Sequence, residues 1–505
     1  MHPPVPRRAL GATVLSAALV LTGGCFSGSA GGAADSERLS VAMLNPPRSA
    51  LNPFSDDAFK LSRLGIAETL VQLDEAGDPL PMLATEWRQT ADDTWEFDIR
   101  REVTFHDGTT LDARVVADAL TAATEARPKP RILDGVEWDV RAEGDDQVVI
   151  TTNFTDPLTP HRLSSPQLSI LSPDAYQGDG NTVDPTGHGS GPFELVTLNG
   201  SDSAALDRFE GYWNGTAAAP GIDVSFVPDG AARTAALRTG EADIVEAIPP
   251  SQAALLDEGT FREVPMPRTN TLYLNTREDG ASGVFADPAM RAAVRAAVDA
   301  EPLVESVYES RADLADGLLG PALPWSDQRP ERGEGPEPAD PDGARITLAT
   351  FTDRAELPEV AATLEQQLEA AGFEVEQEIR EYAQIESDAL NGEFDLFILS
   401  RATVLDSGDP VAYMVSDFSC DGGFNISGLC DTEVDDLLSA AEQEGDPDAR
   451  RTATLEAERA ILETDAAIPL LHERVIQGDA PGTEGALFDP RERLLVGLET
   501  HRSTD

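Results

Sequence analysis

Histidine, serine and cysteine are the side chains of this sequence best suited to catalysis or to metal binding. Ser190 lies in Gly187-His188-Gly189-Ser190-Gly191, but a nucleophile elbow requires glycine at the positions that His188 and Pro192 occupy. No two histidines have the spacing of a metal-ligand pair. The six histidines are His2, His106, His161, His188, His472 and His501. We therefore expect no enzymatic activity, no bound metal and no cofactor.

Cys25 ends a segment that is typical of an export signal. Arg7 and Arg8 precede an apolar stretch over residues 9–21, which is shorter than the roughly 20 residues of a spanning helix. Leu21-Thr22-Gly23-Gly24-Cys25 then resembles a lipobox, the peptidase site at which the cysteine becomes acylated. We expect residues 1–24 to be a signal peptide and residues 25–37 to be a flexible tether, lipid-anchored at Cys25. The Sec and twin-arginine export routes both remain open.

Cys420 and Cys430 remain as a pair in a chain addressed to an oxidising compartment, so we expect them to form a disulfide. Two free thiols are the alternative, and a metal site is disfavoured because no histidine neighbours the pair. The same export signal predicts an extracytoplasmic protein that is anchored to the cell membrane through lipid.

The elements that would position a site alternate between strand and helix patterns from Leu39 onward, which predicts a mixed α/β fold. Residues 346–350 are an expected strand, followed by a helix with one apolar face that Gly372 ends. That face comprises Leu357, Val360, Ala361, Leu364 and Leu368. Residues 394–399 are apolar except for Asp395, which is typical of a strand inside a sheet. Since ligands bind beyond the carboxyl ends of such strands, we expect a site after Leu399.

Further elements are expected in the first three hundred residues. Residues 95–99 and 103–105 predict two short strands, and the turn His106-Asp107-Gly108 leads to a helix over residues 112–124. Residues 136–150 predict a β-hairpin whose turn is at residues 143–146. Asp287 is expected to cap a helix that begins at Pro288.

Several motifs resemble those of one family, the extracellular solute-binding proteins of family 5, which serve peptide and nickel ABC importers. The most specific are three segments in order, residues 81–87, 95–100 and 103–108, which begin Pro-Met-Leu, Trp-Glu-Phe and Val-Thr-Phe. Others are Gly189-Ser190-Gly191-Pro192-Phe193, Tyr212-Trp213-Asn214-Gly215 and Asp406-Ser407-Gly408-Asp409-Pro410. The resemblance covers nearly the whole chain after the tether, and its dipeptide- and oligopeptide-binding members are the nearest.

The resemblance implies an α/β architecture, the two-lobed periplasmic-binding-protein type II fold of the large cluster with an extra small α/β domain. We expect lobe I to comprise residues 38–70, 190–275 and 478–505, and lobe II residues 276–477. Residues 71–189 are the expected additional domain, packed on lobe I. The turn Phe105-His106-Asp107-Gly108 and the glycines at 189 and 191 are interpreted as structural features of this fold.

The resemblance also assigns ligand contacts. It places Asp406 where a carboxylate pairs with the ligand's α-ammonium group, and Arg354 where a guanidinium binds the ligand's carboxylate. Thr403, just before Asp406, is the third expected contact. A turn-forming role for Asp406 and a surface position for Arg354 are the alternatives.

The implied function is capture of a small peptide and its delivery to an ABC permease by a monomeric, membrane-anchored protein. A nickel or metal-chelate carrier of the same family is the alternative, and an exported serine hydrolase or a sensory protein would be a different class. With 37 Lys and Arg against 91 Asp and Glu, the formal net charge of −54 excludes nucleic acid as a partner. The acidic residues are spread along the chain, which favours salt adaptation over steering of cationic ligands.

Overall fold

The computed structural model describes residues 37–133, 135–177, 182–333, 335–404 and 407–503. Contacts between residues make 37–505 one compact unit. No helix within the described ranges is both long enough and apolar enough to cross a membrane.

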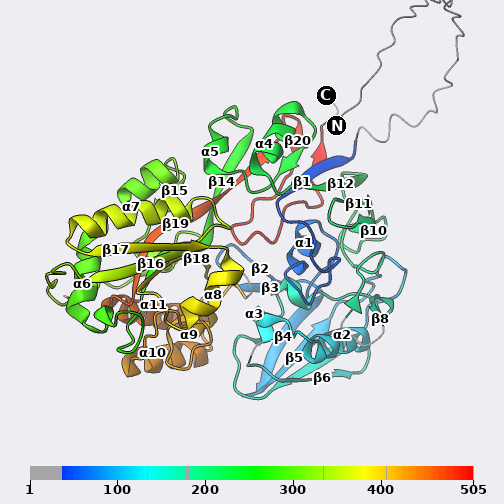
Figure 1. The fold of residues 1–505 in the computed structure, drawn as a ribbon. Helices are drawn as coiled ribbons and strands as arrows, with labels where there is room; N and C mark the ends of the chain where they lie inside the picture. Colours follow the sequence, from blue (N-terminus) through cyan, green and yellow to red (C-terminus); the bar gives the residue numbers. More distant parts are fainter. Residues whose placement is uncertain (1–36, 134, 178–181, 334, 405–406, 504–505) are drawn as a thin grey trace, which may run out of the picture. The chain divides into compact units, whose positions relative to one another are not determined.

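An 11-stranded mixed sheet dominates this unit, with the strand order β10-β11-β12-β1-β13-β19-β14-β18-β16-β17 and β15 paired with β19. Its strands are β1 (Leu39–Met43), β10 (Phe193–Asn199), β11 (Ser203–Arg208), β12 (Gly221–Phe226), β13 (Ile244–Val245), β14 (Phe261–Leu274), β15 (Ala312–Leu314), β16 (Arg345–Phe351), β17 (Glu374–Arg380), β18 (Leu396–Ala402) and β19 (Ala467–Asp479). The strands β16, β17 and β18 lie beside β14 and β19 (Figure 1).

A separate antiparallel sheet has the order β4-β5-β7-β6. It comprises β4 (Ala84–Ala91), β5 (Thr94–Ile99), β6 (Trp138–Glu143) and β7 (Gln147–Thr152). Three two-stranded ribbons complete the strands: β2 (Val71–Leu73) with β3 (Pro79–Pro81), β8 (Tyr176–Gln177) with β9 (Thr182–Val183), and β20 (Thr483–Glu484) with β21 (His501–Arg502).

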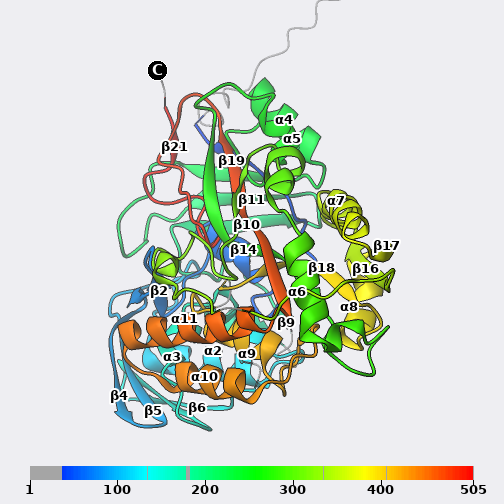
Figure 2. The same cartoon turned by 90° about the vertical axis from the view of Figure 1, so that its left-hand side faces the viewer.

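Eleven α-helices connect these strands within the described residues. They are α1 (Ala58–Arg63), α2 (Ala113–Glu125), α3 (Thr159–Arg162), α4 (Gly230–Thr239), α5 (Pro250–Ala253), α6 (Pro288–Ala297), α7 (Leu357–Ala370), α8 (Tyr382–Leu390), α9 (Val411–Phe418), α10 (Thr432–Gln443) and α11 (Pro447–Glu463). Figure 2 shows α10 and α11 side by side, next to α9.

The two long strands β14 and β19 lie inside the main sheet. On one side of them are β10, β11, β12, β1 and β13, and on the other side are β18, β16 and β17. The antiparallel pairing of β14 and β19 is interrupted between Pro265 and Thr269. On one side of the interruption β19 pairs with β13, and on the other side β14 pairs with β18. Pro265 and Pro267 have no N–H group to donate, so this stretch of β14 cannot form a regular ladder.

Two large apolar cores lie on either side of this interruption. One is built by β14 beyond it together with α6, α7, β16 and β18, and includes Leu272, Phe285 and Leu364. The other is built by β1, β5, β12 and α2, and includes Val41 and Phe97. The predicted additional domain shares this second core with the predicted lobe I, because buried residues of both belong to it.

The predicted elements around the expected site are present. Asp395 is buried in the segment before β18 and accepts hydrogen bonds of 2.9 Å from the backbone N–H groups of Ser282 and Thr347. These bonds explain how one acid is tolerated beside an apolar strand. β18 lies between β14 and β16, as predicted. The Asp287 carboxylate caps α6 by accepting from the Ala289 N–H at 2.9 Å.

The expected strand at residues 103–105 was wrong. Thr104 forms only an isolated bridge with Thr110, because the turn that follows folds the chain back on itself too soon for a ladder. The predicted helix after this turn is α2, whose first N–H groups are capped by Asp112.

Two glycines and one aromatic residue of the family motifs, Gly189, Gly191 and Tyr212, are buried. A Cβ atom on Gly189 would approach the Ile66 carbonyl oxygen to 2.0 Å, and one on Gly191 would approach that of Gly65 to 2.2 Å. Nearby, the buried Glu68 carboxylate accepts hydrogen bonds from Tyr212 Oη at 2.8 Å and Trp213 Nε1 at 3.1 Å. The close backbone approach favours the structural interpretation of the glycines at 189 and 191, and the bonds to Glu68 give Tyr212 and Trp213 a structural role as well.

Candidate functional site

Arg354 lies in the loop between the carboxyl end of β16 and the start of α7. Its Nη1 forms an ion pair of 2.7 Å with Oε2 of Glu473, a buried residue of β19. Burial opposes the charge of Arg354, but Glu473 and other nearby groups outweigh it and raise the arginine's pKa. The side chain as a whole is 35% exposed, so part of it is reachable by solvent although its guanidinium is held by the protein.

The Glu473 carboxylate is fixed by further hydrogen bonds from two other strands. Its Oε1 accepts from Ser400 Oγ of β18 at 2.5 Å and from Asn270 Nδ2 of β14 at 2.9 Å. The same Asn270 nitrogen lies 3.0 Å from the Tyr308 hydroxyl oxygen. Glu473 therefore orients Arg354 rigidly. We call Arg268, Asn270, Tyr308, Arg354, Ser400 and Glu473 the arginine–glutamate cluster.

Arg268 brings a second guanidinium to this cluster, at the point where the pairing of β14 and β19 is interrupted. Its Nη1 donates to the carbonyl oxygen of Ser400 at 3.1 Å and lies 3.5 Å from the Ser400 hydroxyl. Burial, together with the positive charge of Arg354, lowers the pKa of Arg268 to about 10. Sequence reasoning did not predict this residue.

Three further charges lie near the cluster: Arg63 at the end of α1, Glu246 just after β13, and Glu492 in the C-terminal segment. Glu492 has a positive φ of 52°, which is uncommon for a non-glycine residue. Its negative charge acts on both Arg268 and Arg354. Arg63 Nη2 pairs with Glu246 at 2.9 Å and with Glu492 at 3.5 Å. Two carboxylates thus share one arginine on this side.

Of the two remaining predicted ligand contacts, the structure describes Thr403 but not Asp406. Thr403 is buried, and both its backbone N–H and its hydroxyl bond to the Pro267 carbonyl oxygen, at 2.8 and 3.1 Å. These bonds join the end of β18 to the interrupted stretch of β14. Asp406 lies outside the described residues, and nearby Asp409 accepts from the Val411 N–H at the start of α9.

A serine, a histidine and an aspartate meet elsewhere in the chain, but without the geometry of a catalytic triad. Nδ1 of His188 lies 2.9 Å from Ser172 Oγ and 3.3 Å from Asp107 Oδ2, so both neighbours use the same ring nitrogen. A triad needs them on opposite nitrogens. Ser190, the serine of the elbow-like motif, is fully buried.

Potential metal ligands were also compared in space. Among the residues whose placement is described, no group of three or more His, Cys, Asp or Glu side chains could hold a metal ion. Burial lowers the pKa of His472, which neighbours Glu473, to about 4. Its Nδ1 lies 2.9 Å from the Thr269 hydroxyl, so one of its two ring nitrogens already has a hydrogen-bond partner.

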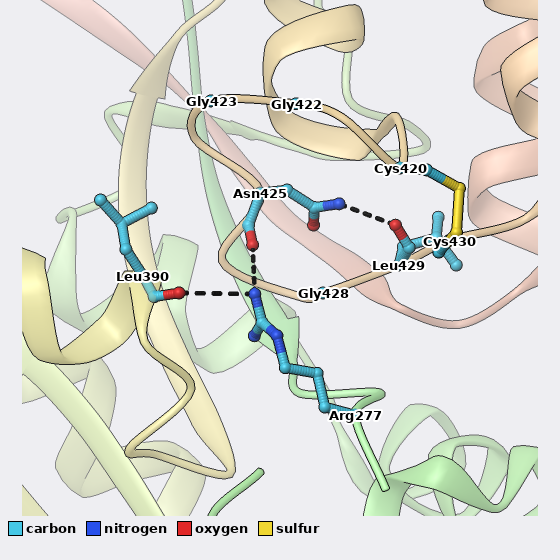
Figure 3. Close-up of a pocket in the computed structure, with 9 residues that line it drawn as sticks. All are labelled: Arg277, Leu390, Cys420, Gly422, Gly423, Asn425, Gly428, Leu429 and Cys430. Atoms are coloured by element: carbon cyan, nitrogen blue, oxygen red, sulfur yellow. Dashed lines mark hydrogen bonds between the residues drawn. A yellow bond between two sulfur atoms is a disulfide. The ribbon is translucent and has the colours of Figure 1, made fainter. Parts of the chain in front are cut away.

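A surface pocket of about 220 Å³ lies beside the predicted disulfide, which the structure contains (Figure 3). Arg277 points into this region and donates to the carbonyl oxygens of Ile426 at 3.0 Å and Asn425 at 2.9 Å. The arginine therefore braces the loop that the disulfide closes. A second pocket of about 500 Å³ is lined by residues at one end of β5 and β7. Neither pocket includes Arg354 or Thr403.

Two residues of the arginine–glutamate cluster, Asn270 and Glu473, were not predicted from the sequence. Asn270 and Glu473 are fully or almost fully buried polar residues, and they lie within mostly buried stretches of β14 and β19. A polar residue in a buried strand needs partners, and such residues often belong to functional sites. Their pairing, however, joins segments that are 203 positions apart.

Comparisons with known proteins agree with the architecture. Residues 78–425 match the family described as Bacterial extracellular solute-binding proteins, family 5 Middle. Glutathione-binding protein GsiB of Salmonella paratyphi A is 26% identical over 428 residues, covering 79% of this chain and 81% of that protein. Probable di/tripeptide-binding protein 5 of Pseudomonas aeruginosa is 26% identical over 453 residues, covering 80% and 84%.

A solved structure extends the agreement to the fold. The nickel ABC transporter protein of Bacillus halodurans superposes with a TM-score of 0.76 at 25% identity, covering 92% of this chain and all of that one. The predicted two-lobed periplasmic-binding-protein fold is confirmed. With the family match extending over more than half of the sequence, this chain belongs to the bacterial extracellular solute-binding proteins, family 5.

Proposed function

We propose that this protein captures a small peptide between its two lobes and delivers it to the permease of an ABC importer. The names of two relatives support a peptide ligand, since one binds glutathione and the other is a probable di/tripeptide-binding protein. The resemblance to peptide-binding members, which includes the motif that begins at Asp406, points the same way.

The observation that carries the proposal is the Arg354–Glu473 pair at the carboxyl end of β16. Among the described residues, Arg354 donates hydrogen bonds only through Nη1, so its other donors are available for a ligand carboxylate. A guanidinium oriented in this way suits bidentate carboxylate binding. The Asp406 carboxylate is the proposed partner of the ligand's ammonium group.

Closure of the lobes would occur about the interrupted stretch of β14. We propose lobe I to comprise residues 38–70, 190–275 and 478–505, lobe II residues 276–477, and the additional domain residues 71–189. The irregular pairing between Pro265 and Thr269 lies near the proposed boundary at residue 275 and supports a hinge there. A ligand that contacts both lobes would stabilise the closed form.

Export and anchoring complete the proposal. Residues 1–24 would be removed as a signal peptide, and Cys25 would carry the lipid that holds the monomer at the outer face of the cell membrane. The tether of residues 25–37 would let the folded unit reach its permease. A mass of the mature protein that includes a diacylglyceryl group on Cys25 is the expected result of intact-mass spectrometry.

The binding role of Arg354 is tested by calorimetry on the mature protein. The probe is a tripeptide library, followed by the best-binding member. Arg354→Gln should weaken binding by about 2 to 5 kcal/mol, because the ligand carboxylate loses its charged partner. Asp406→Asn should weaken it by a similar amount, about 2 to 5 kcal/mol, through the ammonium group.

Two results of this titration would contradict the proposal. The first is unchanged affinity in both variants. The second is wild-type protein that ignores every tripeptide and binds Ni²⁺ or a nickel chelate, because it would replace the peptide by the metal carrier that the Bacillus halodurans relative represents.

A further inference from the structure

The charges of the arginine–glutamate cluster do not balance within it. Arg268 and Arg354 supply two guanidinium groups, and Glu473 supplies one carboxylate. That carboxylate pairs with Arg354. Within residues 37–404 and 407–503, apart from the undescribed positions 134, 178–181 and 334, no carboxylate lies within 4.0 Å of the Arg268 guanidinium nitrogens.

Arg268 is nevertheless held in a defined position beside Arg354. A chain of polar contacts joins the two: Arg268 Nη1 to Ser400, Ser400 Oγ to Glu473 Oε1, and Glu473 Oε2 to Arg354 Nη1. The Ser400 hydroxyl donates its proton to the carboxylate, so its oxygen is free to accept from Arg268. The two guanidinium groups are thus organised by the same serine and glutamate.

The hydrogen-bonding capacity of Arg268 is incompletely used. Its Nη1 donates to an oxygen of the protein, whereas its Nε is buried and has no hydrogen-bond partner in the part of the chain that is described. Burying a guanidinium that lacks an ion-paired carboxylate among the described residues, and whose Nε lacks a hydrogen bond, is costly. A carboxylate arriving from a ligand would supply both.

The charge of Arg354 alone does not suffice for such a ligand. Glu473 already neutralises it at 2.7 Å, so a ligand carboxylate next to Arg354 would also face the negative charge of Glu473. A second cation on the other side of Glu473 compensates that repulsion. Arg268 is on that side, linked to Glu473 through Ser400.

We propose that Arg268 is a second carboxylate-binding residue of the ligand site, which makes the protein selective for peptides with a free C-terminal carboxylate. This inference rests on the proposed function. It assigns Ser400 and Glu473 as positioning residues for the two arginines. Because Arg268 follows Pro267 in the interrupted stretch of β14, ligand binding would also add a contact directly at the proposed hinge.

The test compares each peptide with its C-terminal amide. Affinities of the best-binding tripeptide and its amide are measured by calorimetry for wild type, Arg268→Gln, Arg268→Lys, Arg354→Gln and Arg262→Gln. Arg262 is the control, because it lies on the same strand but its guanidinium packs over the Phe488 ring. Thermal unfolding of each variant checks that it is folded.

We expect the acid-over-amide preference of the wild type to fall at least tenfold in Arg268→Gln, to be partly restored in Arg268→Lys, and to be unchanged in Arg262→Gln. If Arg268→Gln weakened acid and amide equally while Arg354→Gln reduced the preference, only this inference would be wrong. If the wild type bound no tripeptide, or showed no acid preference, the proposed carboxylate site itself would be wrong.

Discussion

At the scale of single residues, buried charges in this protein occur where several polar groups converge. Glu473 is the clearest case, because three strands or loops bring an arginine, a serine and an asparagine to its two oxygens. Removal of one partner from such a group leaves an uncompensated charge. The same reasoning applies to Glu68, whose carboxylate accepts hydrogen bonds from two aromatic side chains and also lies near Arg100.

Glu68 gives a prediction for the pH dependence of stability. Burial raises its pKa to about 7 from an ordinary value of 4.5, although its hydrogen bonds with Tyr212 and Trp213 oppose the shift. The folded protein therefore binds a proton more tightly at this carboxyl than the unfolded chain does. The stability that the group contributes is present below about pH 4.5 and is lost as the pH rises to about 7.

Urea unfolding of wild type and Glu68→Gln at pH 5 and pH 8 tests this. Between the two conditions the wild type should lose on the order of 2 to 3 kcal/mol relative to the variant. Other titrating groups, including Asp417, are present in both proteins and cancel in the comparison. A difference in unfolding free energy that is the same at both pH values would contradict the pKa shift of Glu68.

At the scale of elements, the loop between α9 and α10 is fixed in two ways. The Cys420–Cys430 disulfide closes it, and Asn425 Nδ2 donates across it to the carbonyl oxygens of Leu429 at 2.7 Å and Ser419 at 2.9 Å. Arg277 adds hydrogen bonds to the carbonyl oxygens of Asn425 and Leu390, which Figure 3 shows. Without the disulfide, we therefore expect the loop to keep its conformation and the protein as a whole to become less stable.

The double variant Cys420→Ser/Cys430→Ser should be less stable to urea by roughly 2 to 3 kcal/mol, because a closed loop of this length restricts the unfolded chain. Wild type treated with a reductant should unfold at the same urea concentration as the variant. An unfolding curve of the oxidised wild type that coincides with both would show that the disulfide does not stabilise the folded state.

Sequence patterns predicted the helices and strands near the site. They did not predict the side-chain contacts between segments that are far apart in the sequence. Local periodicity and a terminal glycine predict α7, and an apolar run predicts the central strand β18. The partner of Arg354 was not predicted, because Glu473 is 119 positions away and only sheet pairing brings them together. Thr403 shows the same limit, because the bond of its hydroxyl to Pro267 of β14, 136 positions away, was not predicted. Its ligand contact stays a prediction.

At the scale of the whole molecule, an ion pair links parts of the chain that are far apart in sequence. Nη2 of Arg451 in α11 contacts both carboxylate oxygens of Asp78, at the β2–β3 turn, at 2.7 Å. Arg491 donates to the Glu75 carbonyl oxygen of the same turn at 2.9 Å. Asp78 belongs to the proposed additional domain and Arg451 to the proposed lobe II, so this pair would exist only when they are together.

Asp78→Asn should weaken peptide binding about two- to fivefold without altering any proposed ligand contact, because a partly exposed ion pair contributes up to about 1 kcal/mol to the closed form. Arg459→Gln is the matched control, since Arg459 pairs with Glu463 within α11 itself. Calorimetry with the same tripeptide measures both. Equal affinities for Asp78→Asn and wild type would mean that the pair does not contribute to closure.

The account depends most on the identity of the bound solute. Native mass spectrometry of the freshly purified mature protein, followed by release and sequencing of the bound molecule, tests it directly. The expected result is a population heavier by the mass of a short peptide with a free C-terminal carboxylate, which Arg354→Gln strongly reduces. A bound metal chelate, or a solute without a carboxylate, would contradict the account.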